Sequence, residues 1–450
     1  MNAYLASVLE NVRTKHGNEP EFVQTVEEVL SSLEPVIEKH PEYEKVDLLN
    51  RMVEPERMFT FRVVWCDDNG QWHTNRGWRC QFNGAIGPYK GGLRFQKNVY
   101  EGIIKFLGFE QTFKNSLTGL PIGGAKGGSD FDPAGKSDAE VMRFCQSFMT
   151  ALYRYIGPDI DVPAGDMGVG GREIGYLYGQ YRRLKGVWEN GVLTGKGLSY
   201  GGSLIRPEAT GYGAMYYLQE VLKHENDTIE GKRIAISGYG NVGWGIMKKA
   251  AQLGAKVTYF AGPDGYVHDP DGVITDEKLN FILEMRAKDP MHCKPYADKF
   301  GCEFVAGEKC WGVKDVDVYM PAAMQNDVKM ESAEKIAASG VKYYIEVANM
   351  PTTNDALNYL RAQKGIIVAP SKAVNAGGVG VSALEMAQNS ERLVWTAEEV
   401  DAQLHKMMKT IHKESADAAA EYGLGYDLVA GANIAGFKKV AEAMMEQGCF

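Results

Sequence analysis

Three lysines of this chain lie among neighbours that leave the ammonium group little steric cover. Lys90 lies in GPYKGGLRF and Lys126 in GGAKGG, where small residues flank the charged side chain. Lys114 lies in GFEQTFKNS, three residues after Gln111, so both would share one face of a helix. Each lysine alone is better explained as a solvated side chain beside a flexible turn. Three such lysines together favour a common binding site.

A cluster of ammonium groups suits an anionic substrate that carries two carboxylates. The surrounding glycines allow a ligand or the backbone to approach closely. A lysine crowded by other cations and shielded from water has a lowered pKa, so it can act as a base near neutral pH. Asp166, in DVPAGDMGVGGRE, could exchange protons with it, although an acidic residue in a glycine-rich loop is as often a turn or N-cap residue.

A second motif, Gly238-Tyr-Gly240-Asn-Val-Gly243, has the spacing of a dinucleotide-binding turn. A β-rich run precedes it and a helix-compatible run follows, the context that this motif needs. The three glycines would allow a tight turn, close approach to a pyrophosphate, and close packing of helix on strand. An ordinary strand–helix turn is the alternative. The next strand ends without an arginine, and Asp264 would repel a 2′-phosphate if it pointed inward, which favours NAD over NADP.

The elements that would carry these residues differ between the two halves of the chain. In the second half, short apolar strands alternate with helices, the pattern of a parallel, doubly wound sheet. These strands are expected at 232–238, 255–260, 316–322, 342–349 and 365–370.

In the first half, the segments 57–65 and 77–83 read as a β-hairpin. A helix follows at 101–117, then a glycine-rich loop at 121–133. Pro35 should split the helical pattern that begins near Phe22.

We therefore expect an α/β protein with two domains and a cleft between them. Residues 1–201 would form a substrate-binding and oligomerisation domain, to which a C-terminal helix within 425–450 returns. Residues 202–424 would form a Rossmann-type domain. The glycine- and serine-rich run at 195–205 marks the boundary.

Composition excludes several other classes. The formal charge of −9 and the lack of a basic stripe argue against a nucleic-acid binder. No apolar run approaches the ~18 residues that span a membrane, and the first residues do not resemble a signal peptide. The seven cysteines include no CxxC pair, which favours a reducing compartment, the cytoplasm, and no structural metal site.

Seven segments, in order and spacing, resemble the hexameric bacterial-type glutamate dehydrogenases of the Glu/Leu/Phe/Val dehydrogenase family. The resemblance covers the chain from near residue 20 to its end. It implies a homohexamer that interconverts L-glutamate with 2-oxoglutarate and ammonium, using NAD or NADP. The segments are GPYKGGLRF, PIGGAKGGSDFDP, DVPAGDMGVG, RPEATGYG, GYGNVG, EVANMPTT and PSKAVNAGGV.

The resemblance also assigns substrate-binding residues. Lys90 and Ser382 would bind the side-chain carboxylate. Lys114 and Gln111 would bind the α-carboxylate, with Gly165 close by.

Catalytic and cofactor-binding residues are implied in the same way. Lys126 would be the catalytic lysine, deprotonating the amine and then activating water against iminoglutarate, while Asp166 relays protons. Arg206 matches a position that supports the cleft, and Asn375 matches a cleft position near the nicotinamide or the substrate. The cofactor would be bound by Thr210, Gly238, Gly240, Asn241, Val242, Gly243 and Asn349.

Three other functions remain to be separated from this one. A branched-chain or aromatic amino-acid dehydrogenase of the same family is the main alternative, but those relatives lack a cation at the position of Lys90 and have an apolar residue at that of Ser382. A 2-hydroxy acid dehydrogenase would need a histidine acid/base, and no histidine lies in a conspicuous motif. A nucleotide-sensing module without catalysis should have lost Lys126 or Asp166.

Overall fold

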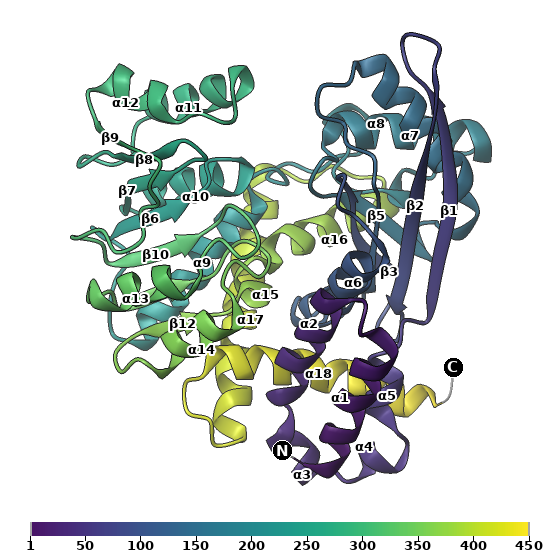
Figure 1. The fold of residues 1–450 in the computed structure, drawn as a ribbon, viewed down its shortest axis with the longest axis horizontal. Helices are drawn as coiled ribbons and strands as arrows, with labels where there is room; N and C mark the ends of the chain where they lie inside the picture. The colour runs from purple at the N-terminus through teal and green to yellow at the C-terminus, as the bar shows by residue number, and fades with distance from the viewer. Residues whose placement is uncertain (1, 449–450) are drawn as a thin grey trace.

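Two β-sheets, each accompanied by helices, form the two halves of the molecule (Figure 1). The structure is a computed structural model that describes residues 2–448. The first sheet has the order β1-β2-β4-β3-β5, with a β1–β2 antiparallel hairpin and parallel β3, β4 and β5. The predicted hairpin is confirmed. The strands are β1 (Arg57–Cys66), β2 (Trp72–Asn83), β3 (Tyr89–Phe95), β4 (Gly123–Ser129) and β5 (Asp161–Gly165).

The prediction of a glycine-rich loop at 121–133 is wrong, because residues 123–129 form the buried central strand β4. The glycines of β3 and β4 allow neighbouring strands and helix α6 to pack closely. A Cβ at Gly124 would lie 2.1 Å from Oγ1 of Thr112, and a Cβ at Gly91 of β3 would lie 1.6 Å from the carbonyl oxygen of Ala125. Glycine normally disfavours strands, so the local pattern indicated a loop.

Helices cover both faces of the first sheet. The helix predicted at 101–117 is confirmed as α6, and Pro35 does divide the early helical pattern, since it lies in the first turn of α3. The bounds in this half are α1 (Ala3–His16), α2 (Pro20–Ser31), α3 (Glu34–Lys39), α4 (Glu42–Lys45), α5 (Leu48–Met52), α6 (Glu101–Leu117), α7 (Asp138–Leu152) and α8 (Gly171–Lys185).

The second sheet has the order β12-β11-β10-β6-β7-β8-β9. Its first five strands are parallel and confirm the five predicted strands, whereas β8 and β9 add an antiparallel edge that the sequence did not indicate. The strands are β6 (Arg233–Ser237), β7 (Lys256–Ala261), β8 (Gly265–His268), β9 (Glu303–Ala306), β10 (Val318–Pro321), β11 (Tyr343–Ile345) and β12 (Ile367–Ala369).

The helices of this half are α9 (Ala209–His224), α10 (Asn241–Gln252), α11 (Asp276–Lys288), α12 (Lys294–Phe300), α13 (Met330–Ala338) and α14 (Asn354–Ala362). Four more helices lie after β12. They are α15 (Ser371–Val374), α16 (Ala376–Glu391), α17 (Ala397–Glu421) and α18 (Leu428–Gln447).

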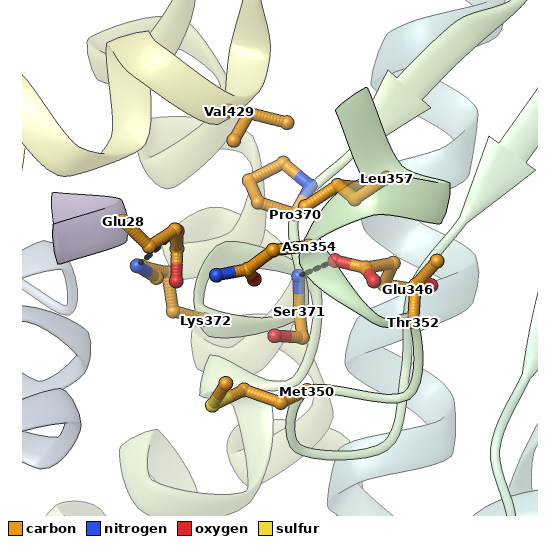
Figure 2. A pocket seen from close by; sticks show the side chains of 10 residues that line it. All are labelled: Glu28, Glu346, Met350, Thr352, Asn354, Leu357, Pro370, Ser371, Lys372 and Val429. Carbon is orange, nitrogen blue, oxygen red and sulfur yellow. Dashed lines mark hydrogen bonds and ion pairs between the residues drawn. The ribbon is translucent and has the colours of Figure 1, made fainter. Parts of the chain in front are cut away.

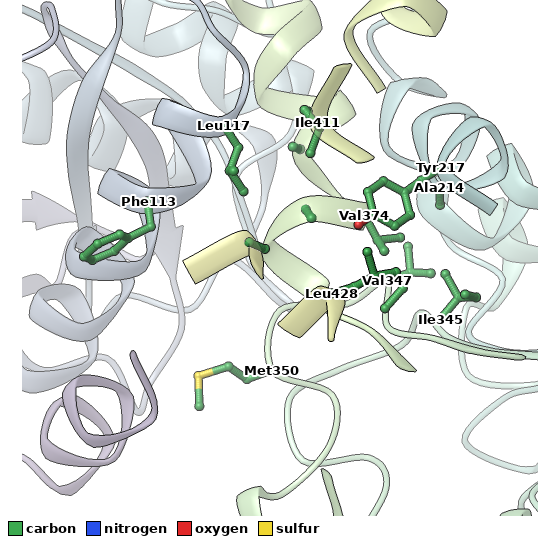
Figure 3. Close-up of a cluster of buried hydrophobic side chains, with 14 of the residues drawn as sticks. Phe113, Leu117, Ala214, Tyr217, Ile345, Val347, Met350, Val374, Ile411 and Leu428 are labelled. Carbon is green, nitrogen blue, oxygen red and sulfur yellow. The ribbon is translucent and has the colours of Figure 1, made fainter. Parts of the chain in front are cut away.

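The last helix joins the two halves. In Figure 1, α18 runs from below the second sheet toward α1 and α5, and it packs against both α17 and α6. Figure 3 shows part of the continuous apolar core at this junction, with Phe113 of α6, Ile411 of α17 and Leu428 of α18 around it. Packed helices therefore connect the two sheets, and one hydrophobic cluster reaches from β2 to β6 and β7, besides two separate clusters around the individual sheets.

Within residues 2–448, no helix is both long and apolar enough to cross a membrane.

Candidate functional site

The register of β3, β4 and β5 brings the charged residues of three separate motifs to one face. Lys90 pairs with Gly124 of β4 and with Val162 of β5. Since paired residues share a face and alternate residues along a strand return to it, Lys90 and Arg94 of β3 lie on the same face as Lys126 of β4. Helix α6, which carries Lys114, packs on this face against β4.

Asp166, directly after β5, binds two of these cations. Its Oδ1 lies 3.3 Å from Nζ of Lys126, and its Oδ2 accepts a hydrogen bond of 2.7 Å from Nε of Arg94. Burial alone would raise the pKa of Asp166, but Arg94 and Lys126 outweigh it and hold the pKa well below its usual range. Asp166 is therefore a carboxylate across the physiological range.

Sequence reasoning missed Arg94, although it lies in the same motif as Lys90. The signal was the even spacing of residues 90 and 94, which places both on one face only once the segment is known to be a strand.

Lys126 of β4 and Lys114 of α6 both have the lowered pKa that a base requires. Burial lowers the pKa of Lys126, and although Asp166 opposes the shift, Arg94 adds to it. Burial lowers the pKa of Lys114 to about 8, with Glu110 opposing the shift and Lys126 adding to it. Beside Lys114 on α6, Gln111 donates a hydrogen bond of 2.6 Å to Asn115.

Lys90 is the most enclosed of the three lysines, with 1% of its surface exposed. Its Nζ donates to the carbonyl oxygen of Val162 at 3.0 Å and to Oγ1 of Thr194 at 2.8 Å. No carboxylate within residues 2–448 lies in ion-pair distance of it. Burial, followed by the positive charge of Arg206, lowers its pKa well below the ordinary value. An anionic ligand would restore the charge balance here.

Ser382, on α16, is connected to this end of the site through Arg206. Nε of Arg206 donates a hydrogen bond of 2.7 Å to Oγ of Ser382, which itself donates to the carbonyl oxygen of Gly378. Gly165 ends β5 immediately before Asp166. The structure thus brings the predicted substrate residues of the first half together, with Ser382 linked to them by the arginine.

The glycine motif after β6 has the local geometry of a phosphate-binding turn. Gly238 has φ of +80°, and a Cβ there would lie 2.9 Å from Cα of Ala323. A Cβ at Gly243 would lie 2.0 Å from the carbonyl oxygen of Gly238, so only glycine allows α10 this close to the strand end. Gly240 has open space beside it, and α10 begins at Asn241 with its N–H groups directed toward that space.

A pocket of about 630 Å³ opens at this turn, within the size range of cofactor sites. Its lining includes Val242, Pro263 and Arg286 besides the glycine turn. Arg286 donates a hydrogen bond of 2.7 Å to Oδ1 of Asn241. Asp264 lies three residues after the end of β7 and is not among the residues that line the pocket. Burial would raise the pKa of its carboxyl group, but hydrogen bonds from the N–H groups of Cys293 at 2.9 Å and Lys294 at 3.2 Å lower it, so Asp264 carries a negative charge.

Three more residues predicted to lie in the cleft come from the segment after β11, the start of α16 and the start of α9. Oδ1 of Asn349 accepts a hydrogen bond of 3.0 Å from Nδ2 of Asn375, which also donates to the carbonyl oxygen of Val347. Thr210 lies in the first turn of α9, against Gly378, where a Cβ would come within 2.4 Å of its hydroxyl.

A second pocket lies at the junction of the two halves and is too small for a metabolite, with about 10 Å³ of free space. Figure 2 shows Glu346, after β11, accepting from the N–H of Ser371, while Glu28 of α2 pairs with Lys372 at 3.1 Å. The other carboxylate oxygen of Glu346 is buried without a hydrogen-bond partner, and burial raises its pKa to about 7.

Metal chemistry has no obvious place among the described residues. In the part of the chain from 2 to 448, no group of three His, Cys, Asp or Glu side chains could hold a metal ion.

Comparison with known proteins identifies the family. Residues 201–448 match the family model described as Glutamate/Leucine/Phenylalanine/Valine dehydrogenase, and residues 55–183 match the Glu/Leu/Phe/Val dehydrogenase dimerisation domain. The chain belongs to the Glu/Leu/Phe/Val dehydrogenase family. The resemblance of its motifs to this family and the two-domain α/β fold are thereby confirmed.

Relatives within the Glu/Leu/Phe/Val dehydrogenase family extend over the whole chain. The NAD-specific glutamate dehydrogenase of Clostridium symbiosum is 66% identical over 448 residues, covering 100% of this chain and 99% of the relative. The NADP-specific glutamate dehydrogenase of Haemophilus influenzae is 52% identical and covers 100% and 99%.

Solved structures of family members have the same fold as this chain. A glutamate dehydrogenase structure at 66% identity has a TM-score of 0.99 and covers 100% of both chains. A glutamate dehydrogenase of Plasmodium falciparum, at 48% identity, has a TM-score of 0.96 and covers 99% of this chain and 95% of its own.

Proposed function

We propose that this chain is an NAD-dependent glutamate dehydrogenase, which catalyses the reversible oxidative deamination of L-glutamate to 2-oxoglutarate and ammonium. The observation that carries the proposal is Lys90, a buried ammonium group without a carboxylate partner in residues 2–448, on the same face as Lys126 and its partner Asp166. The names of the relatives at 66% and 52% identity support it.

The substrate assignment follows from charge. Lys90, with Ser382 and Arg206 close by, would bind the side-chain carboxylate. Lys114 and Gln111 on α6 would bind the α-carboxylate, beside Gly165. A branched-chain or aromatic side chain would leave the ammonium of Lys90 buried and unpaired, which costs several kcal/mol. That cost favours glutamate over the other amino acids used in the family.

Proton transfer would depend on Lys126. Its lowered pKa provides a neutral amine that accepts a proton from the α-ammonium group of the substrate, since the amine must be neutral before Cα is oxidised. After iminoglutarate has formed, Lys126 would first return that proton to solvent, with Asp166 as relay, and the neutral lysine would then deprotonate the water that attacks the imine. Asp166, held as a carboxylate by Arg94, orients Lys126 and is in place to exchange a proton with it.

The residues present fit a nicotinamide dinucleotide, which when bound supplies the hydride acceptor. The open space at Gly240 and the N-terminus of α10 suit a pyrophosphate. Gly238, Gly243 and Val242 shape the same turn. Asn241, Thr210 and Asn349 would position the remaining parts. NAD is favoured over NADP because the relatives at 66% and 52% identity are named NAD-specific. Asp264 adds a negative charge three residues after β7, although its carboxylate is turned to the N–H groups of Cys293 and Lys294 and does not line the pocket.

The assembly, location and domain limits are part of the proposal. The match of residues 55–183 to a dimerisation domain supports a homohexamer built from the first half. Six cysteines in the described part of the chain are free thiols, in keeping with the cytoplasm. The division into residues 1–201 with 425–450 and residues 202–424 is supported by the packing of α18 on α6.

Steady-state kinetics tests the function directly. We expect ammonium-dependent oxidation of NADH with 2-oxoglutarate, slower oxidation of NADPH, and little oxidative deamination of leucine, valine or phenylalanine. Turnover of leucine without turnover of glutamate would refute the substrate assignment. Absence of turnover with either nicotinamide cofactor would favour a protein without catalytic activity.

A further inference from the structure

A buried ion pair joins α16 to the segment that follows β5 and α8. Lys196 and Glu385 have fully buried side chains, and Nζ of Lys196 lies 2.7 Å from Oε1 of Glu385. The N–H of Gly195 donates a hydrogen bond of 2.9 Å to Oε2 of the same carboxylate. One carboxylate on α16 therefore fixes both the backbone and a side chain of residues 195–196.

The segment around residues 194–196 contacts Lys90 through a hydrogen bond. Oγ1 of Thr194, directly before Gly195, accepts the hydrogen bond of 2.8 Å from Nζ of Lys90. The N–H of Thr194 donates to the carbonyl oxygen of Pro163 in β5 at 3.1 Å. The position of Thr194, and with it that of the Lys90 ammonium, depends on where residues 195–196 are held.

The same helix carries the other half of the proposed carboxylate site. Ser382 precedes Glu385 by three residues, so the two lie on one face of α16. Ser382 accepts the hydrogen bond from Arg206. Toward the end of α16, Asn389 accepts from Nζ of Lys196 at 2.9 Å and donates to the carbonyl oxygen of Gly201 at 2.7 Å. Helix α16 is thus tied to residues 195–206 at three successive turns.

A buried ion pair is a weak contributor to stability, because desolvation of both charges offsets their attraction. Its placement therefore suggests another use. Glu385 is also one of the charges that act on Lys90 and on Arg206, and in both cases it favours the protonated form. It balances two cations that would otherwise repel each other in a buried space.

We propose that Glu385 is a positioning residue for recognition of the substrate's side-chain carboxylate, because it fixes Thr194, and through it Lys90, relative to Ser382. The inference rests on the proposed use of glutamate. It extends the site to a residue that touches neither substrate nor cofactor, and it makes the ion pair with Lys196 part of substrate selection.

The test compares two substrates of equal chain length. 2-Oxoglutarate has the distal carboxylate, whereas 2-oxopentanoate lacks it. For Glu385→Gln we expect KM for 2-oxoglutarate to rise about 10-fold, which corresponds to about 1.4 kcal/mol of lost binding. KM for NADH and kcat/KM for 2-oxopentanoate should stay near the wild-type values. The kcat/KM ratio of the two oxo acids would therefore fall about 10-fold.

A double variant covers the case in which Glu385→Gln fails to fold with an unpaired buried lysine. Lys196→Met/Glu385→Leu removes both charges, a change that is often tolerated, and we expect the same fall in the ratio. The matched control is Glu19→Gln, which breaks the Lys105–Glu19 pair at 2.7 Å, far from Ser382 in the sequence. It should lower the melting temperature without changing the ratio.

The outcomes separate this inference from the proposed function. A wild-type enzyme that does not prefer 2-oxoglutarate over 2-oxopentanoate would overturn the proposed function. A wild-type enzyme with that preference, retained in both Glu385 variants, would overturn only the inference. An equal loss of activity on both oxo acids would show a general structural role for Glu385 and also overturn the inference.

Discussion

Nζ of Lys126 in β4 lies 3.3 Å from Oδ1 of Asp166, the residue directly after β5, and the two form an ion pair. Oδ2 of the same carboxylate accepts a hydrogen bond of 2.7 Å from Nε of Arg94. Burial and two neighbouring charges therefore set the protonation state of the proposed base, Lys126. Asp166 raises the pKa of Lys126, whereas burial and Arg94 lower it. Removal of Asp166 should lower the pKa of Lys126 and removal of Arg94 should raise it, so the two changes should move the pH profile of activity in opposite directions.

Asp166→Asn removes the negative charge that favours protonated Lys126. The pKa of Lys126 should fall further, so the acid limb of kcat/KM for glutamate should move to lower pH. The overall rate should drop about 10²–10⁴-fold, as expected when a group involved in proton transfer is lost. Stopped-flow and steady-state profiles from neutral to alkaline pH provide the measurement. An unchanged acid limb would mean that Lys126 is not the group that titrates.

Arg94→Met removes a cation that lowers the pKa of Lys126 and keeps Asp166 ionised. Both pKa values should rise, so the acid limb for glutamate oxidation should move to higher pH and the rate at neutral pH should fall. The same profiles measure the shift. Arg62→Met is a control, because that arginine lies on the edge strand β1 and should leave the profile in place. A downward shift in Arg94→Met would contradict the charge balance described above.

Lys90→Leu should abolish most use of glutamate. Loss of a buried, charge-assisted contact costs about 2–5 kcal/mol, so kcat/KM should fall by about 30-fold to about 5,000-fold. Binding of NADH, measured by fluorescence titration, should be unchanged because the nucleotide pocket lies at the second sheet. Lys97→Leu, at a lysine with 84% of its side chain exposed, is the matched control and should be neutral. Wild-type kinetics in Lys90→Leu would exclude this lysine from substrate binding.

Asp264→Ser should weaken the discrimination between the two cofactors. A serine can still accept the hydrogen bond from Cys293 but no longer repels a 2′-phosphate. We expect the kcat/KM ratio of NADPH to NADH to rise about 10-fold, the effect of about 1.4 kcal/mol. Asp271→Ser, at an exposed position beyond β8, should leave the ratio unchanged. If the ratio does not respond, the preference is set elsewhere in the pocket.

Glu346 should make stability depend on pH in an unusual direction. Its pKa is raised from 4.5 to about 7 in the folded chain, so between these values the folded state retains a proton that the unfolded state has lost. Stability contributed by this group therefore falls as pH rises through that window, by up to about 3 kcal/mol. Glu346→Gln should remove the penalty and raise the melting temperature near about pH 8 more than near about pH 5.

The matched control for Glu346 is Glu331→Gln, at a glutamate with 81% of its side chain exposed. Its melting temperature should follow that of the wild type across the same pH range. Equal stabilisation of Glu346→Gln at both pH values would show that ionisation of Glu346 is not the cause.

Periodicity and turn chemistry were sufficient wherever the signal is local. The alternation of strands and helices after residue 230, the helix at 101–117 and the hairpin before it were all predictable, because each depends on contacts between near neighbours in the chain. The glycine turn from Gly238 to Gly243 was predictable for the same reason, since the positive φ of Gly238 is local and a Cβ at Gly243 would meet the carbonyl oxygen of Gly238.

Tertiary contacts decided the features that no local pattern indicates. The sequence by itself determined the fold class and the glycine turn and indicated the lysines of the proposed site, because those depend on residue type and short spacing. It did not determine that GGAKGG is a central strand, since the crowding that requires glycine comes from Thr112 of α6. Nor did it reveal that Arg94 binds Asp166, 72 residues away, or that Glu385 binds Lys196 at a separation of 189. Such partners are set by strand register and helix docking, and no local pattern records them.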